Sequence, residues 1–154
     1  MTDVALVLIA FAGILHLGVF AAASLAWRPL RTWRLVGIRD EAAAETARPW
    51  ASTLGWVAMV LAIGAIGGAI GVWMLSGSLD CAQWTPECAA EQVRVELAPM
   101  PALAVMVFSA AGMVVTAIAL AVAGRRAVMR AAAVQGILPA LGLILLAIGA
   151  AVGR

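Results

Sequence analysis

Five polar side chains within long apolar stretches are the residues of this chain that could do chemistry, namely His16, Thr53, Ser109, Thr116 and Gln135. An imidazole can exchange a proton near neutral pH, and hydroxyl and amide groups can hold a ligand by hydrogen bonds. General acid–base catalysis needs a positioned pair of titratable groups, and His16 is the titratable member of the set. The pattern predicts no catalytic residues and leaves a ligand-binding site as the chemistry to consider.

His16 has three interpretations. A neutral ring hydrogen-bonded to a carbonyl or hydroxyl group would be structural, whereas an accessible ring would bind a ligand or a proton. Haem or metal ligation would require further His, Cys or carboxylate ligands at the same depth, and the apolar stretches contain none. We therefore predict no metal and no cofactor.

The stretches that must position these side chains are long and free of charge. The chain has 154 residues, of which 65% are hydrophobic and 12% charged. Residues 4–27, 49–79, 97–124 and 131–153 contain no Asp, Glu, Lys or Arg. A helix needs about 20 apolar residues to cross about 30 Å of hydrocarbon. The sequence predicts an all-α membrane four-helix bundle in a single domain, 1–154, with spans at about 4–27, 52–75, 101–123 and 131–152.

The basic residues predict the orientation of these spans. All ten are Arg, and eight of them lie in the loops 28–51 and 124–130, whereas the loop 76–100 contains Arg94 alone. Basic residues near the ends of spans stay on the cytoplasmic side. Both termini and the loop 76–100 are therefore expected outside. A chain rich in Ala, Gly, Val and Arg is typical of a GC-rich bacterial genome, which points to the bacterial plasma membrane.

Two short features of the loops are expected to be structural. Cys81 and Cys88 both lie in the predicted outer loop, and a turn can close this spacing into a disulfide on an oxidising side. A redox-active pair would more often be Cys-x-x-Cys. In the first inner loop, Asp40 can cap a short helix over 41–47, which Pro49 would end.

Arginine residues of the first inner loop can also bind lipid. Each adds about 1 kcal/mol of attraction to an anionic membrane surface. The residues expected to contact lipid headgroups are Arg28, Arg31 and Arg34. A role limited to setting topology is the alternative, and the two roles do not exclude each other.

Glycine residues of the second span form two overlapping Gly-x-x-x-Gly pairs, made of Gly64, Gly67, Gly68 and Gly71. Glycine permits the close backbone approach that stabilises helix pairs in lipid. The pairs could serve packing within the bundle or a dimer interface, and the sequence does not separate these. Ser109 and Thr116, seven residues apart, are expected on one seam of the third span.

The depths of the polar residues allow a shared cavity. Along ideal helices, His16 lies about 16 Å and Thr116 about 12 Å from the inner ends of their spans. Gln135 and Thr53 are shallower, at about 6 Å. Pro139 cannot donate to the carbonyl of Gln135, so a kink and a free carbonyl are expected there. A polar cavity open to the cytoplasm, with His16 at its floor, is one arrangement that these positions permit.

Several short segments resemble one family of membrane proteins. They include His16, Trp27 followed by Arg28-Pro29-Leu30-Arg31, Val36-Gly37, Ala47-Arg48-Pro49, Gly55, Val134-Gln135-Gly136 and Pro139-Ala140. Together they resemble the small four-helix bacterial membrane proteins of the domain-of-unknown-function family 1304, over most of the chain except the outer loop. The resemblance implies the topology and no established activity.

The chain also departs from the pattern of that family. Similar proteins carry Glu where this chain has Ala23, and Asn-Gln-Gly where it has Thr53-Leu54-Gly55. If those polar residues form a family site, this chain has lost much of it.

These observations favour a non-catalytic membrane protein. The first hypothesis is an accessory or structural four-helix bundle that packs with membrane lipids or partner helices, as a homodimer or in a larger membrane complex. The alternative is small-molecule or lipid binding, or transport, through a cavity near His16, Thr116 and Gln135. An enzyme is the least favoured class, and nucleic-acid binding is not expected because topology already accounts for the Arg residues.

Overall fold

The computed structural model describes residues 2–25, 40–77, 85–123 and 126–152. Its elements are α1 (Thr2–Phe20), the π-helical turn η1 (Ala21–Leu25), α3 (Glu41–Leu75), α4 (Pro86–Leu97), α5 (Met100–Ala123) and α6 (Arg126–Val152). Four helices are long and apolar enough to cross a membrane, in segments that belong to α1, α3, α5 and α6. The all-α architecture with four candidate spans is confirmed, and the chain is a multi-pass membrane protein.

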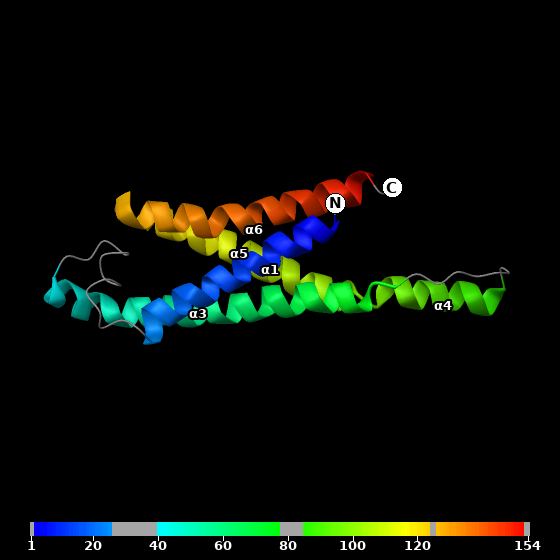
Figure 1. Cartoon of the computed structure of the whole chain (residues 1–154), viewed down its shortest axis with the longest axis horizontal. Coiled ribbons are helices and arrows are strands. Elements are labelled where there is room, and N and C mark those ends of the chain that lie inside the picture. The colour runs from blue at the N-terminus through cyan, green and yellow to red at the C-terminus, as the bar shows by residue number, and fades with distance from the viewer. Residues whose placement is uncertain (1, 26–39, 78–84, 124–125, 153–154) are drawn as a thin grey trace.

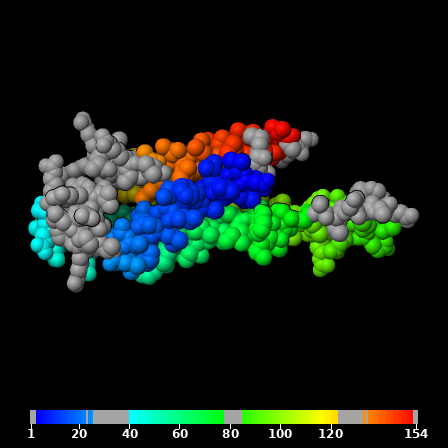
Figure 2. All heavy atoms as spheres, in the orientation of Figure 1, coloured from blue at the N-terminus to red at the C-terminus, as the bar shows by residue number. Residues whose placement is uncertain are grey.

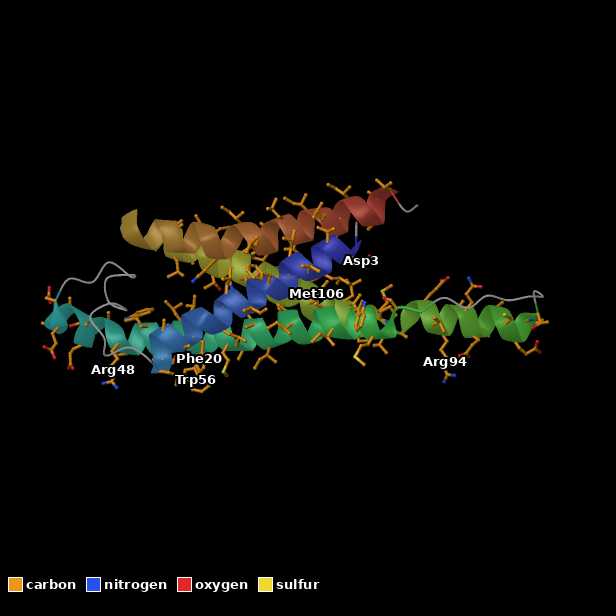
Figure 3. All side chains as sticks on the ribbon, viewed as in Figure 1. Asp3, Phe20, Arg48, Trp56, Arg94 and Met106 are labelled. Atoms are coloured by element: carbon orange, nitrogen blue, oxygen red, sulfur yellow. The ribbon has the colours of Figure 1, made fainter. Side chains whose placement is uncertain are left out.

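The four long helices form a closed ring. In the order α1, α3, α5, α6, each packs against the next, and α6 packs against α1. Both chain ends lie at one end of the bundle (Figure 1). The centre is filled by the buried side chains of Ile9, Met106 and Met113, and Figure 3 labels Met106 where the helices cross. We call the half of the bundle with the chain ends the terminal half, and the other half the distal half.

Glycine brings the helices together at all four seams of this ring. A methyl group added at Gly13 would lie 2.7 Å from Cγ1 of Ile66, and one at Gly136 would lie 2.8 Å from Cβ of Ala117. Such distances are below van der Waals contact, so these positions accept no side chain without movement. Close backbone approach replaces the hydrophobic effect as the source of helix association in lipid.

The fourth seam, between α3 and α5, is the closest. A methyl group added at Gly68 would lie 2.8 Å from the backbone N of Met106 and 2.8 Å from the carbonyl O of Ala102. Backbone atoms cannot move aside as side chains can. The two helices are therefore locked at this point.

The second span begins earlier than the sequence indicates. Asp40 caps α3 as predicted, because its Oδ1 accepts a hydrogen bond from the backbone N of Ala43 at 2.8 Å. The expectation that Pro49 ends a short helix is wrong, since α3 continues through it to Leu75 as one helix of 35 residues. Pro49 removes the bond to the carbonyl of Glu45, but Glu45 is exposed, so water can satisfy that group.

The described part of the predicted outer loop contains a helix. It contains α4, which Thr85 caps by accepting a hydrogen bond from the backbone N of Cys88 at 3.2 Å. Pro86 follows at the first helical position, where a missing N–H costs nothing. The helix has no buried residues and extends beyond the terminal end of the bundle (Figure 2).

Helix α1 contacts different helices at its two ends. Near its start, Ile9 lies against Gly142 of α6. At its far end the ring of Phe20 meets that of Trp56 on α3 edge to face, with centroids 5.1 Å apart. Figure 1 shows α1 crossing from α6 to α3, and Figure 3 shows the Phe20 and Trp56 pair in the distal half.

Candidate functional site

One stripe of α1 carries His16 into the bundle. Ala5, Ile9 and Ala12 precede it at helical spacing, and all four side chains are buried, with His16 only 2% exposed. Residues spaced three and four apart share a face of a helix. The same stripe that builds the apolar core therefore delivers an imidazole into it.

The ring of His16 is held in one tautomer. Its Nδ1 lies 2.9 Å from the backbone O of Ala12. A carbonyl oxygen only accepts, so Nδ1 carries the proton and donates it. In the neutral ring Nε2 then bears a lone pair, and it can accept a hydrogen bond from a ligand.

Gln135 lies at the level of His16 on the neighbouring helix. A methyl group at Gly142 would lie 3.2 Å from Cδ1 of Ile9, so α1 and α6 touch there. His16 is seven residues after Ile9, and Gln135 is seven residues before Gly142. Seven residues make about two turns and return to the same face of a helix. Because α1 and α6 run in opposite directions (Figure 1), the two polar side chains share a level.

Pro139 adds a second polar group next to Gln135. It is fully buried in α6, and its ring nitrogen cannot donate to the carbonyl of Gln135. In lipid such a carbonyl needs another partner. The side chain of Gln135 is partly buried. This turn of α6 therefore carries an amide side chain and a carbonyl that lacks its usual helical donor.

The predicted hydroxyl groups lie on α3 and α5, and two of them bond to their own helices. Thr116 donates to the carbonyl of Gly112 on its own helix at 2.7 Å, and Thr53 is exposed and donates to that of Pro49 at 3.0 Å. Ser109 is buried on α5 against Gly64 of α3. Since α5 lies diagonally across the ring from α1, the structure gives no support to a cavity shared by His16 and Thr116.

Sequence reasoning missed Ser24. Its Oγ is buried and has no hydrogen-bond partner among the residues that the structure describes, and it lies in the π-helical turn that follows α1. A serine in a regular helix can bond to the carbonyl four residues back. Turns of π-helix are rare in proteins, and those that occur are often found at functional sites. The sequence feature that could have identified it is a polar serine within the Ala-rich segment before Trp27.

The four predicted packing glycines of α3 divide into two groups. Gly64, Gly68 and Gly71 face α5, in contact with Ser109, Met106 and Ala102 respectively. Gly67 differs, because a methyl group there would meet no atom within 4 Å and the residue is exposed. Gly64, Gly68 and Gly71 therefore pack within the chain, whereas Gly67 points away from it.

Several predicted site residues lie outside the described part of the chain. Cys81 is one of them, so its disulfide with Cys88 remains a prediction. The other residues are the expected lipid contacts Arg28, Arg31 and Arg34.

Metal binding finds no support in the described ranges. There, no group of three or more His, Cys, Asp or Glu residues could hold a metal ion.

Comparison of the chain with protein-family models, curated proteins and solved structures gave no match.

Proposed function

We propose that the chain is a non-catalytic accessory bundle of a bacterial plasma membrane, which packs with lipid and with a second copy of itself. The observation that carries this proposal is the contrast between the seams and the outer face of α6. Glycine contacts complete the packing inside the ring, whereas the spanning segment of α6 is the least buried of the four, at 11% against 28–33% for the others.

The outer face of α6 has the spacing of a helix interface. Its exposed apolar side chains are Ile137, Leu141, Ile144 and Ile148, at intervals of four, three and four residues. This is the repeat with which two helices interlock along a left-handed seam. It supports α6 as the helix that meets the second copy.

The orientation with both termini outside is part of the proposal. Trp50 and Trp73, exposed near opposite ends of the membrane-spanning part of α3, are placed as interfacial anchors. Arg48, two residues before Trp50 in the chain, lies at the distal end (Figure 3), where the rule for basic residues expects the cytoplasm. The predicted disulfide would then lie outside, at the terminal end where α4 extends. Membership of the domain-of-unknown-function family 1304, as a distant member, belongs to the same proposal and adds no activity.

Photo-crosslinking in native membranes tests the role of α6. A photoreactive amino acid at Ile144 should give a product at twice the 15.8 kDa mass of the chain. The matched control is Ile70 on the outer face of α3, which is similarly exposed, at 50% against 53% for Ile144. A product from position 144 alone supports the proposal, whereas no doubled product, or equal products from both positions, overturns it.

Native mass spectrometry in a mild detergent tests the proposal that the chain is an accessory bundle without a bound small molecule. A mass of two copies with only labile lipid adducts is expected. A persistent non-lipid adduct that disappears in His16→Ala would contradict an accessory role and identify a small-molecule binder.

A further inference from the structure

Helix α4 lies outside the bundle, and one of its faces is apolar and exposed. Pro86, Ala90, Val93 and Leu97 follow one another at intervals of four, three and four residues, which places them on a single face of the helix. All four are exposed, Val93 at 54% and Leu97 at 57%. We call these four residues the α4 stripe.

The opposite face of α4 packs against the rest of the chain. Cys88, Gln92 and Val95 are half-buried there, at intervals of four and three residues. A methyl group added at Gly77 would lie 3.4 Å from Cγ1 of Val95, which is ordinary van der Waals contact. This contact orients the helix, so the α4 stripe faces away from the described part of the chain.

Lipid does not cover the α4 stripe as it covers the exposed apolar faces of the spans. Four of the 12 residues of α4 are charged, and the helix extends beyond the terminal end of the bundle (Figure 2). Trp73, exposed near the end of α3, is placed to mark the membrane interface that α4 has left behind. An apolar helix face of this kind in the aqueous phase is typical of a surface that binds another helix.

The charges beside the stripe indicate the chemistry of that helix. At 3.6 residues per turn, Glu87 and Glu96 flank the stripe on its two sides. Arg94 is engaged by Glu91, with 3.6 Å between Nη1 and Oε2. With three Glu and one Arg, α4 has a net charge of −2. A second copy would present the same excess of carboxylates, and like charges repel across an interface, whereas a basic helix is complementary.

We propose that α4 docks a basic amphipathic helix of another protein in the aqueous phase at the terminal end. Apolar residues of that helix, spaced three and four apart, pack on Val93 and Leu97. Its Lys or Arg side chains meet Glu87 and Glu96. Apolar contact supplies the affinity, and the flanking charges select the partner. The surface belongs to α4, whereas the proposed dimer uses α6, so each proposal can fail alone.

Binding of a defined peptide to the chain in nanodiscs of zwitterionic lipid tests this proposal. The probe is a fluorescent helical peptide whose Leu residues repeat at intervals of three and four and are flanked by Lys. The matched control peptide has Glu in place of each Lys, and nanodiscs without protein measure binding to lipid. The Lys peptide should bind saturably to the chain and more weakly as salt is added, because salt screens exposed charges.

Three variants locate the surface. Leu97→Gln should weaken binding about tenfold, as expected when an apolar side chain that the partner buries is lost. Glu87→Gln should weaken it about two- to fivefold, the value of an exposed ion pair. The control is Asp3→Asn, which removes an exposed carboxylate from α1 at the same end of the bundle (Figure 3) and should leave binding unchanged.

A photoreactive amino acid at Val93 identifies the occupant of the stripe. Its matched control is Glu91, on the other side of the helix and similarly exposed. A product with the Lys peptide from position 93 alone supports the proposal. A product of doubled mass without peptide would mean that α4 pairs with a second copy, and a lipid adduct would mean that it lies on the membrane, and either result overturns the proposal. So does equal binding of the two peptides, or binding that neither Leu97→Gln nor Glu87→Gln weakens.

Discussion

The terminal and distal halves of the bundle are held together by different means. In the terminal half, Gly68 and Gly142 bring backbones so close that an added methyl group would meet Met106, Ala102 or Ile9. In the distal half, glycine still packs α6 against α5 at Gly136, but α1 is held on α3 by side chains, in the ring pair of Phe20 and Trp56. Backbone contacts tolerate almost no change in volume, whereas side-chain contacts can adjust. The contact of Gly68 with α5 should therefore tolerate less change in volume than the contact of Phe20 with Trp56.

Gly68→Ala should give the largest loss of stability. The new methyl group would lie 2.8 Å from backbone atoms of both Ala102 and Met106, and overpacking of this kind costs about 3 kcal/mol. Unfolding by SDS in mixed micelles, followed by circular dichroism, measures it. The control is Gly67→Ala one residue away, which meets nothing and should be neutral or stabilising by up to about 1 kcal/mol through helix propensity. Equal losses in both variants would contradict the described orientation of α3.

Gly64→Ala should cost less, because its neighbour is a side chain. The added methyl group would overlap Oγ of Ser109, which can rotate away, so we expect a loss of about 1–2 kcal/mol. The double variant Gly64→Ala with Ser109→Ala, which lacks the Ser109 hydroxyl, should recover part of that loss. The same unfolding assay gives the coupling free energy, and strictly additive effects would show that the two residues do not touch.

Separating the rings of Phe20 and Trp56 should have a moderate effect. An edge-to-face pair contributes about 0.5–1.5 kcal/mol beyond the area that it buries. A double-mutant cycle with Phe20→Leu and Trp56→Leu isolates this coupling. A coupling near zero would mean that the distal end of α1 is not held on α3 by this contact, and would weaken the contrast between the two halves.

Asp40→Ala should have the smallest effect of the four. It removes the acceptor for the backbone N of Ala43, and the loss of an N-cap costs about 1 kcal/mol. Because the capped turn lies outside the charge-free span, we expect fraying of the start of α3 without loss of the bundle. Amide hydrogen exchange over residues 41–48 measures this, and Asp40→Asn, which retains a capping oxygen, should behave like the unchanged chain.

The helices themselves were predictable from the sequence because a membrane span is defined by length and absence of charge. The extension of α3 through Pro49 was not, since the cost of a proline depends on whether the orphaned carbonyl reaches water. The order Thr85-Pro86-Glu87 contains the cap, first-position proline and acidic first turn of a helix, so α4 could have been predicted from the loop.

The site was less predictable than the spans. The buried, hydrogen-bonded state of His16 agrees with the structural interpretation of the ring, but neither Ser24 nor the separation of His16 from Thr116 could be read from one chain. Both depend on tertiary arrangement, namely a π-helical turn and the order of helices around the ring. The two overlapping glycine pairs are equivalent as sequence patterns, so only the packed structure distinguishes Gly68 from Gly67.

The unbroken course of α3 has a mechanical consequence. A helix of 35 residues is about 52 Å long, whereas the hydrocarbon is about 30 Å thick. Its first two turns, Glu41 to Arg48, therefore extend the same helix beyond the hydrocarbon. Pro49 stands between this extension and the glycine face that packs on α5, at a point where the helix lacks one backbone hydrogen bond.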